Sequence, residues 1–281
     1  MVAPVKPGTD QPTDPGTLGT LHRSRGEFAR AEPLLRAALA AAEAAEPPDG
    51  AALAAALNAL GLVCKDLARY DEARALYERT LALLERAPAP DRREIATVYH
   101  NLGGIEHARG DYAAGEAFAR RGLAIRTKAG GDPRAVAADM VALAALLDGQ
   151  ERYDEAERLY GEALRIFERA PAANAGEIAG VLNNLGALHA RRGRLEQAEL
   201  LLELAVALKQ RTLGPTHPDV AVTLNNLAMT HRRRGDFARG AALYAQAVGI
   251  FEQSLGADHP KAVTCRANAA RCAAAAGEAR A

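Results

Sequence analysis

Apolar and polar residues alternate along this chain with the period of an α-helix. Between residues 182 and 205 two groups of residues follow helical spacing, one before and one after a glycine, and within each group the members share one helical face. The first group is Leu182, Leu185, Gly186 and His189, and the second is Leu195, Ala198, Leu202 and Ala205. Gly193 interrupts the stripe. The window therefore predicts a helix, a tight turn and a second helix.

The same helix-turn-helix unit recurs six times. A row of leucines marks it, with members 42, 42, 41, 42 and 42 residues apart: Leu18, Leu60, Leu102, Leu143, Leu185 and Leu227. Small residues stand one position after this row, at Gly19, Gly61, Gly103, Ala144, Gly186 and Ala228. Others stand 13 positions after it, at Ala31, Ala73, Gly115, Ala156, Ala198 and Gly240. A large side chain in this last row would push the second helix off the first.

These units predict an all-α chain, a right-handed α-solenoid of antiparallel helix pairs that bury their apolar stripes against their neighbours. The predicted boundaries are a disordered Pro-rich leader at 1–16, six helix-turn-helix repeats at 17–260, and a terminal half-repeat with its tail at 261–281. The half-repeat is expected to be a single capping helix. Breakers such as His217-Pro218 separate the units, because proline is tolerated in a first helical turn.

Four short segments carry a family resemblance. They are LNNLG at Leu182–Gly186, LNNLA at Leu224–Ala228, LGPTHPDVA at Leu213–Ala221 and LGADHP at Leu255–Pro260. With the 42-residue period, they resemble the tetratricopeptide repeat of the kinesin-light-chain type over residues 17–276. Repeat 4 departs from this pattern, since Val141 and Ala142 replace the Asn pair and Glu151 replaces the turn glycine. The resemblance implies a tetratricopeptide-like superhelix that binds peptides on its concave face.

The charge balance restricts the class of partner. The 281-residue chain carries 35 basic and 35 acidic residues, and its pI is about 7.1. This balance supplies no bulk attraction for phosphate backbones or anionic lipid, so we expect neither nucleic acid nor membrane as a partner. Three cysteines without a CxxC pair, and the lack of an apolar signal-peptide region, predict reduced thiols and a cytoplasmic protein.

Common catalytic and cofactor signatures are missing from the sequence. It has no GxxxxGK[ST] loop, strand-led GxGxxG, HExxH or GxSxG. We therefore predict that the protein is not an enzyme and has no catalytic residue, metal site or cofactor. His22, His189 and His231 recur four residues after the leucine row, where hydrogen-bonded packing competes with metal or proton chemistry. Cys265 and Cys272 share one helical face, where burial competes with redox sensing.

One face of each first helix offers candidate binding residues. By the family resemblance this face lines the concave groove, and the resemblance implies that Asn58, Asn183 and Asn225 contact a bound peptide. An Asn amide can donate to and accept from a peptide backbone at once, and small neighbours let that backbone approach. The full predicted peptide-binding set is Asn58, Lys65, His100, Asn101, His107, Asn183, Asn184, Arg191, Asn225, Asn226 and Arg232.

Two expectations concern the shape and charge of this groove. Basic residues outnumber acidic ones on the face and its edge, which predicts a mildly basic groove and a protein or peptide partner with an acidic segment. The 41-residue spacing between repeats 3 and 4 coincides with Gly130-Gly131, so this junction is predicted to bend. The second Asn row (Asn101, Asn184 and Asn226) has an alternative role, in which it satisfies loop carbonyls inside the solenoid.

These features predict a non-enzymatic protein-protein interaction scaffold that holds an extended peptide segment of a partner in its concave groove. The alternative is a ligand- or peptide-sensing regulatory segment of a larger signalling protein. A third interpretation is a companion role, in which the solenoid presents a substrate to a separate catalytic domain.

Overall fold

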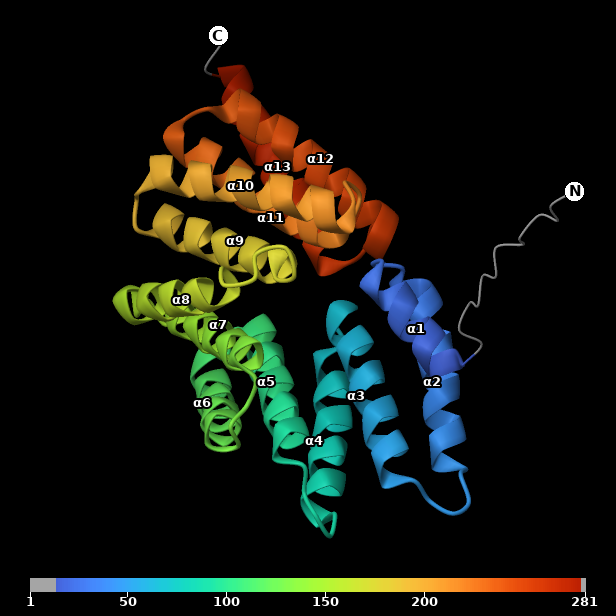
Figure 1. Cartoon of the computed structure of the whole chain (residues 1–281). Coiled ribbons are helices and arrows are strands. Elements are labelled where there is room, and N and C mark those ends of the chain that lie inside the picture. Colours follow the sequence, from blue (N-terminus) through green and yellow to red (C-terminus); the bar gives the residue numbers. More distant parts are fainter. Residues whose placement is uncertain (1–13, 279–281) are drawn as a thin grey trace, which may run out of the picture.

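The computed structural model describes residues 14–278, and this part of the chain contains thirteen helices and no strand (Figure 1). The helices are α1 (Pro15–Ser24), α2 (Phe28–Glu43), α3 (Gly50–Asp66), α4 (Tyr70–Arg86), α5 (Arg92–Arg109), α6 (Tyr112–Lys128), α7 (Pro133–Gly149), α8 (Tyr153–Phe167), α9 (Ala175–Arg191), α10 (Leu195–Leu213), α11 (Pro218–Arg234), α12 (Phe237–Leu255) and α13 (Pro260–Glu278). The predicted all-α solenoid, six helix pairs and a final unpaired helix, is confirmed. Among these thirteen helices, none is both long and apolar enough to cross a membrane.

Local sequence signals set where the helices begin. Asp14 caps α1 by accepting a hydrogen bond of 2.8 Å from the backbone nitrogen of Thr17, and Asp49 and Asp91 cap α3 and α5 in the same manner. Pro15 fits the first turn of α1, where its missing N–H costs no hydrogen bond. The helix therefore starts inside the predicted leader, and residues 1–13 of that leader lie outside the described part of the chain.

The two helices of each pair approach closely at the recurring small residues. A Cβ atom added to Gly61 of α3 would lie 2.9 Å from the ring of Tyr77 on α4. Ala73, 13 positions after the leucine row, is fully buried at the same contact. A larger residue at such a position overpacks the core, typically at a cost of about 1–3 kcal/mol. The predicted packing cause for the small rows is confirmed.

The helices form two layers. The first helices of the repeats contact one another in chain order and form the inner layer, which comprises α1, α3, α5, α7, α9 and α11. Each second helix packs against the first helices on both of its sides. The stack curves until its last full repeat returns to its first, so that α12 contacts α2 (Figure 1). The inner layer thus surrounds a central space.

The junction between repeats 3 and 4 contains a buried ion pair. Arg126 of α6 donates from Nε to Asp139 of α7 at 2.6 Å, and the Nδ1 of His100 lies 2.9 Å from the other oxygen of Asp139. The side chain of Asp139 is only 3% exposed. A Cβ atom on Gly131 would lie 2.6 Å from Cγ of Arg126. This glycine therefore makes room for the arginine, and the ion pair joins the two repeats that the sequence predicts to bend.

Removal of Arg126 tests whether this ion pair holds the junction. In the wild type, we expect amides 129–135 to exchange with solvent as slowly as neighbouring helix ends. Arg126→Ala leaves the buried Asp139 with His100 as its remaining partner, and breaking a buried ion pair typically costs about 3–5 kcal/mol. Hydrogen exchange at the junction should then accelerate. Arg120→Ala, which removes an exposed ion pair with Glu116 on the same helix, is the control and should leave these amides unchanged.

Two turns between paired helices are strained. Ala68 and Glu151 occupy the turn-glycine position and both have φ of 61°, in the left-handed region that side chains disfavour. The other units place glycine there, for example Gly193 with φ of 79°. Repeats 2 and 4 keep the same turn geometry despite their unfavourable residues, so the packing of the helices determines the turn.

Relief of this strain should stabilise the fold. Glu151→Gly and Ala68→Gly each remove a Cβ atom from a left-handed residue, and we expect each to raise the free energy of unfolding by about 1 kcal/mol. The reverse change, Gly193→Ala, should lower it by a similar amount. Urea denaturation of the three variants measures these differences, and a destabilised Glu151→Gly variant would contradict the account.

Candidate peptide-binding groove

Residues from five repeats, the second to the sixth, meet in the central space. A cavity of about 470 Å³ is lined by Lys65 of α3, His100 and His107 of α5, Asn183 and Asn184 of α9, Lys209 of α10 and Asp219 of α11. A second cavity of about 440 Å³ adjoins it and shares His107, Ala145, Asn183 and Asn184. We call these two cavities together the central groove. Gly103, Gly104, Ala142 and Gly180 give the larger cavity a floor with little side-chain bulk.

Most of the predicted binding residues lie in this groove. Seven of the eleven line it: Lys65, His100, His107, Asn183, Asn184, Arg191 and Asn226. The other four lie elsewhere. Asn58 and Asn101 pair with each other, Asn225 lines a separate cavity of about 280 Å³ beside α13, and Arg232 lies near Tyr244 and Cys272. The structure therefore leaves four of the predicted residues, from repeats 2, 3 and 6, outside the groove.

Asparagine side chains connect neighbouring inner helices. The amide nitrogen of Asn101 donates to the side-chain oxygen of Asn58 at 2.8 Å, and that of Asn226 donates to Asn183 at 3.0 Å. Asn183 in turn donates to Asn184 at 3.1 Å. Asn101 and Asn226, of the second Asn row, are thus engaged inside the solenoid, but their partners are the amides of the preceding repeat rather than loop carbonyls. These bonds fix the orientation of the amides that face the groove.

Ion pairs neutralise part of the predicted positive charge of the inner face. Arg191 pairs with Asp148, with one contact of 3.1 Å, and Arg23 donates to Asp66 at 2.8 Å. His100 lies against Asp139 in the ion-pair cluster of the repeat 3–4 junction. The positive charge that we expected along the whole face therefore remains only on the side chains that form no ion pair with these carboxylates.

Two lysines of the groove, Lys65 and Lys209, form no ion pair with a carboxylate within residues 14–278. Lys209 is only 8% exposed, and its Nζ donates to the backbone oxygen of Asp219 at 3.1 Å. Burial lowers the pKa of both lysines, and the nearby charge of Lys261 lowers it further, whereas the carboxylate of Asp219 acts in the opposite direction and raises it. An anion placed between them would favour their charged forms and offset this cost of burial.

Lys209 and Asp219 are groove residues that the sequence interpretation missed. Lys209 lies on a second helix, α10, and Asp219 lies in the first turn of α11, before the positions that were predicted on that helix. Lys209 does carry a sequence signal. It continues the apolar stripe Ala198, Leu202 and Ala205 of α10, and a lysine on such a stripe must either reach solvent or enter a polar cavity.

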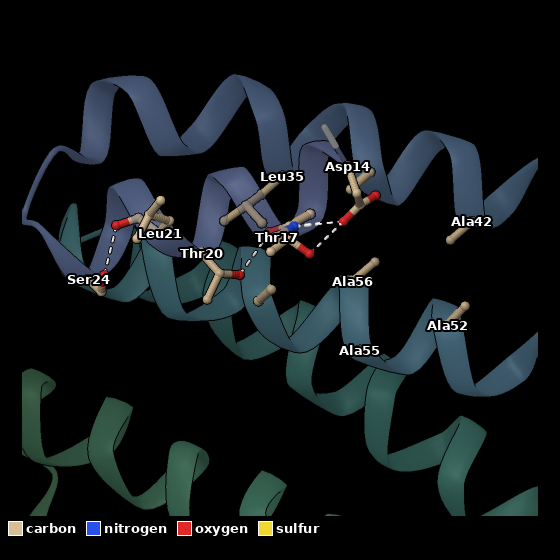
Figure 2. Close-up of a pocket in the computed structure, with 13 residues that line it drawn as sticks. Asp14, Thr17, Thr20, Leu21, Ser24, Leu35, Ala42, Ala52, Ala55 and Ala56 are labelled. Carbon is tan, nitrogen blue, oxygen red and sulfur yellow. Dashed lines mark hydrogen bonds between the residues drawn. The ribbon is translucent and has the colours of Figure 1, made fainter. Parts of the chain in front are cut away.

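A larger cavity, of about 790 Å³, lies between α1, α2 and α3 (Figure 2). It exists because α1 has 10 residues whereas α3 has 17, so no further turns of α1 cover the facing alanines. Its hydroxyl groups are already used within α1, since Thr17 donates to Asp14 and Thr20 donates to Gly16 (Figure 2). With few polar groups left to orient a ligand, it is a weaker candidate than the central groove.

The predicted packing histidines lie against acidic side chains. His231 is 3.5 Å from Glu199, and His189 is 3.8 Å from Glu157. The three cysteines are buried, and burial raises the pKa of Cys64 and of Cys265 to about 11. These contacts and this burial favour packing roles for both residue types over metal or redox chemistry.

The fold and the groove define a class of protein, a helical-repeat scaffold whose inner helices present amide and lysine side chains to a concave cavity. The model of the tetratricopeptide repeat matches residues 16–86, 94–169, 177–250 and 219–281. The chain belongs to the tetratricopeptide repeat family, whose fold is typically a non-enzymatic interaction scaffold. A comparison with curated proteins gives no match.

Solved structures agree with this assignment. BtubC (BKLC) from P. vanneervenii is 24% identical, with 85% of this chain and 94% of that chain covered and a TM-score of 0.56. A putative kinesin light chain from Podosopora anserina is 19% identical, with 70% and 94% covered and a TM-score of 0.50. The quorum sensor NprR in complex with its cognate peptide NprX is 16% identical, with 88% and 68% covered and a TM-score of 0.68. The kinesin-light-chain-like repeat type predicted from the sequence is confirmed.

The histidines make stability depend on pH. Burial lowers the pKa of His107, His189 and His259, and nearby Arg and Lys charges lower it further. Such a histidine binds more protons in the unfolded chain, so its stabilising contribution is complete above the unfolded pKa and is lost as the pH falls through the folded pKa. We expect the free energy of unfolding to decrease from about pH 7 to about pH 5, above the range where most carboxylates titrate.

Urea denaturation across this pH range checks the prediction. A variant with all three histidines replaced by Asn should show a flatter profile. A wild-type profile that stays level between these pH values would contradict the assignment of the histidines.

Proposed function

We propose that the central groove binds an extended peptide segment that carries at least one carboxylate. The observation that carries this proposal is the pair Lys65 and Lys209, which line one cavity with several amides and form no ion pair among the described residues 14–278. A carboxylate is the ligand group that complements them, since it accepts hydrogen bonds from ammonium groups and supplies the missing charge.

The rest of the groove suits a peptide backbone. Asn183 and Asn184 offer amides whose orientation the Asn network fixes, and an amide can bond to a peptide N–H or C=O without reading a side chain. Gly104 and Gly180 line the same cavity and let the backbone of the ligand come close. The expected specificity is therefore for an extended backbone and a negative charge, with little selection among the other side chains.

The fold comparison supports the same proposal. NprR, whose superhelix this chain resembles at a TM-score of 0.68, is in complex with its cognate peptide. The tetratricopeptide repeat thus supplies a fold in which peptide binding is physically feasible, and the residues above supply the chemistry in this chain.

A second candidate function is a peptide-sensing regulatory segment of a larger signalling protein. It is favoured by the distribution of the groove residues over repeats 2 to 6, because a ligand that contacts all of them selects one curvature of the solenoid. The resemblance to a quorum sensor points the same way. Small-angle scattering with and without a bound peptide separates the two functions, since a scaffold should keep its dimensions and a sensor should change them.

Binding to a pool of short, fluorescent, Asp- and Glu-rich peptides tests the proposal. Fluorescence polarisation should show binding that weakens as salt is added, because charge drives part of it. Asn183→Ala should weaken binding by about 1–2 kcal/mol, since a desolvated backbone group loses its partner. Lys65→Met with Lys209→Met should remove most of the salt dependence.

Asn225→Ala is the matched control, because Asn225 has the same residue type and repeat position as Asn183 but lies outside the groove. It should bind like the wild type. The proposal is falsified if the folded triple variant Lys65→Met/Lys209→Met/Asn183→Ala binds the peptides as well as the wild type does.

A further inference from the structure

The start and end of the solenoid meet at two points, and both use the same dipeptide. His217-Pro218 opens α11, and His259-Pro260 opens α13. A Cβ atom on Gly26 would lie 2.6 Å from Cδ of Pro218, and Nε2 of His259 lies 3.3 Å from the backbone oxygen of Asp66. Each dipeptide thus meets the end of a first helix five repeats earlier in the chain.

Both contacts are held by helix caps. Nδ1 of His259 accepts a hydrogen bond of 3.1 Å from the backbone nitrogen of Lys261, so the neutral ring carries its proton on Nε2 and donates to Asp66. His217 caps α11 in the same way, by accepting from the backbone nitrogen of Asp219 at 3.1 Å. The side chain of His259 is 8% exposed. Because caps fix these residues at helix ends, the contacts depend on the position of whole helices.

The two contacts close the inner layer into a ring. Lys65 of repeat 2 and Asp219 of repeat 6 line one cavity, although three repeats lie between them in the chain. The outer helices α2 and α12 also touch at this seam (Figure 1). The central groove is therefore enclosed around its circumference and is reached along the axis of the ring.

We propose that the two His-Pro contacts form a clasp, and that the ring admits a short free peptide or a chain end to the central groove in preference to an internal segment of a folded protein. The inference rests on the proposed function of the groove. A chain end enters a closed ring along its axis. An internal segment enters only after the clasp opens, which breaks the bond from His259 to Asp66 and the contact between Gly26 and Pro218.

The clasp itself is tested without any ligand. Gly26→Leu places a side chain against Pro218 and should open the ring, which small-angle scattering of the full chain detects as a shift to a larger radius of gyration. Gly193→Leu is the matched control, because Gly193 has nearly the same φ, 79° against 75°, but no heavy atom lies within 4 Å of its added Cβ. It carries the same backbone strain and should leave the dimensions unchanged.

A second variant keeps the clasp testable if Gly26→Leu disrupts the folding of the first repeat. The double variant His217→Asn/His259→Asn keeps a capping side chain at both helix starts, but both side chains at the seam are shorter and reach less far across it. It should also increase the radius of gyration while circular dichroism stays helical. Unchanged dimensions in both clasp variants would overturn the clasp.

The preference for chain ends is tested with one acidic peptide, presented either free or as an internal loop of a folded carrier. Wild-type protein should bind the internal form about tenfold more weakly, the factor that the loss of one hydrogen bond produces. Gly26→Leu should reduce this difference, and Gly193→Leu should not. Equal affinity for both forms in a closed wild-type ring would overturn the preference. If neither form binds, the proposed function fails, whereas the scattering result still decides on the clasp.

Discussion

The close approach of the two helices within each repeat is the constraint on which the rest of this structure depends. At Gly61 and Ala73 the helices of repeat 2 are separated by little more than their backbones and the ring of Tyr77. Every repeat sets its rotation relative to the next through such a contact, and the rotations add along the chain. The shape of the central space is therefore the sum of many small packing distances, and a change at one of them would displace residues several repeats away.

This addition explains what the sequence could and could not predict. Helix positions follow from local periodicity, so the thirteen helices and the small-residue contacts could be predicted from the leucine row and its companions. Seven of the eleven predicted binding residues do line the groove, because a helical face is also a local property. The meeting of Lys65 with Lys209 and Asp219 could not be predicted, since it depends on the accumulated curvature of the repeats between them.

The repeat 3–4 junction illustrates a second limit of sequence patterns. Two adjacent glycines and a shortened spacing are typical of a flexible connection, and they predicted a bend there. In the structure, Gly131 is small because the side chain of Arg126 passes over it on the way to Asp139. Nothing in the sequence indicates that Arg126 and Asp139 are buried rather than exposed. In a sequence, a glycine that makes room for a neighbouring side chain cannot be distinguished from a glycine that makes the backbone flexible.

The seam between the first and last repeats forms only when the chain has the right number of repeats. Repeat arrays gain and lose whole units by duplication and deletion, and every remaining interface in such an array is packed as before. The contacts of His217-Pro218 and His259-Pro260 join helices that are five units apart, so they are the part of the molecule that depends on this number. Deletion of one internal repeat would leave a well-packed solenoid that no longer meets itself. The stability of the chain would then be nearly preserved, but the enclosed shape would be lost. Selection for folding alone would therefore tolerate a change in the number of repeats, whereas selection for the enclosed shape would not.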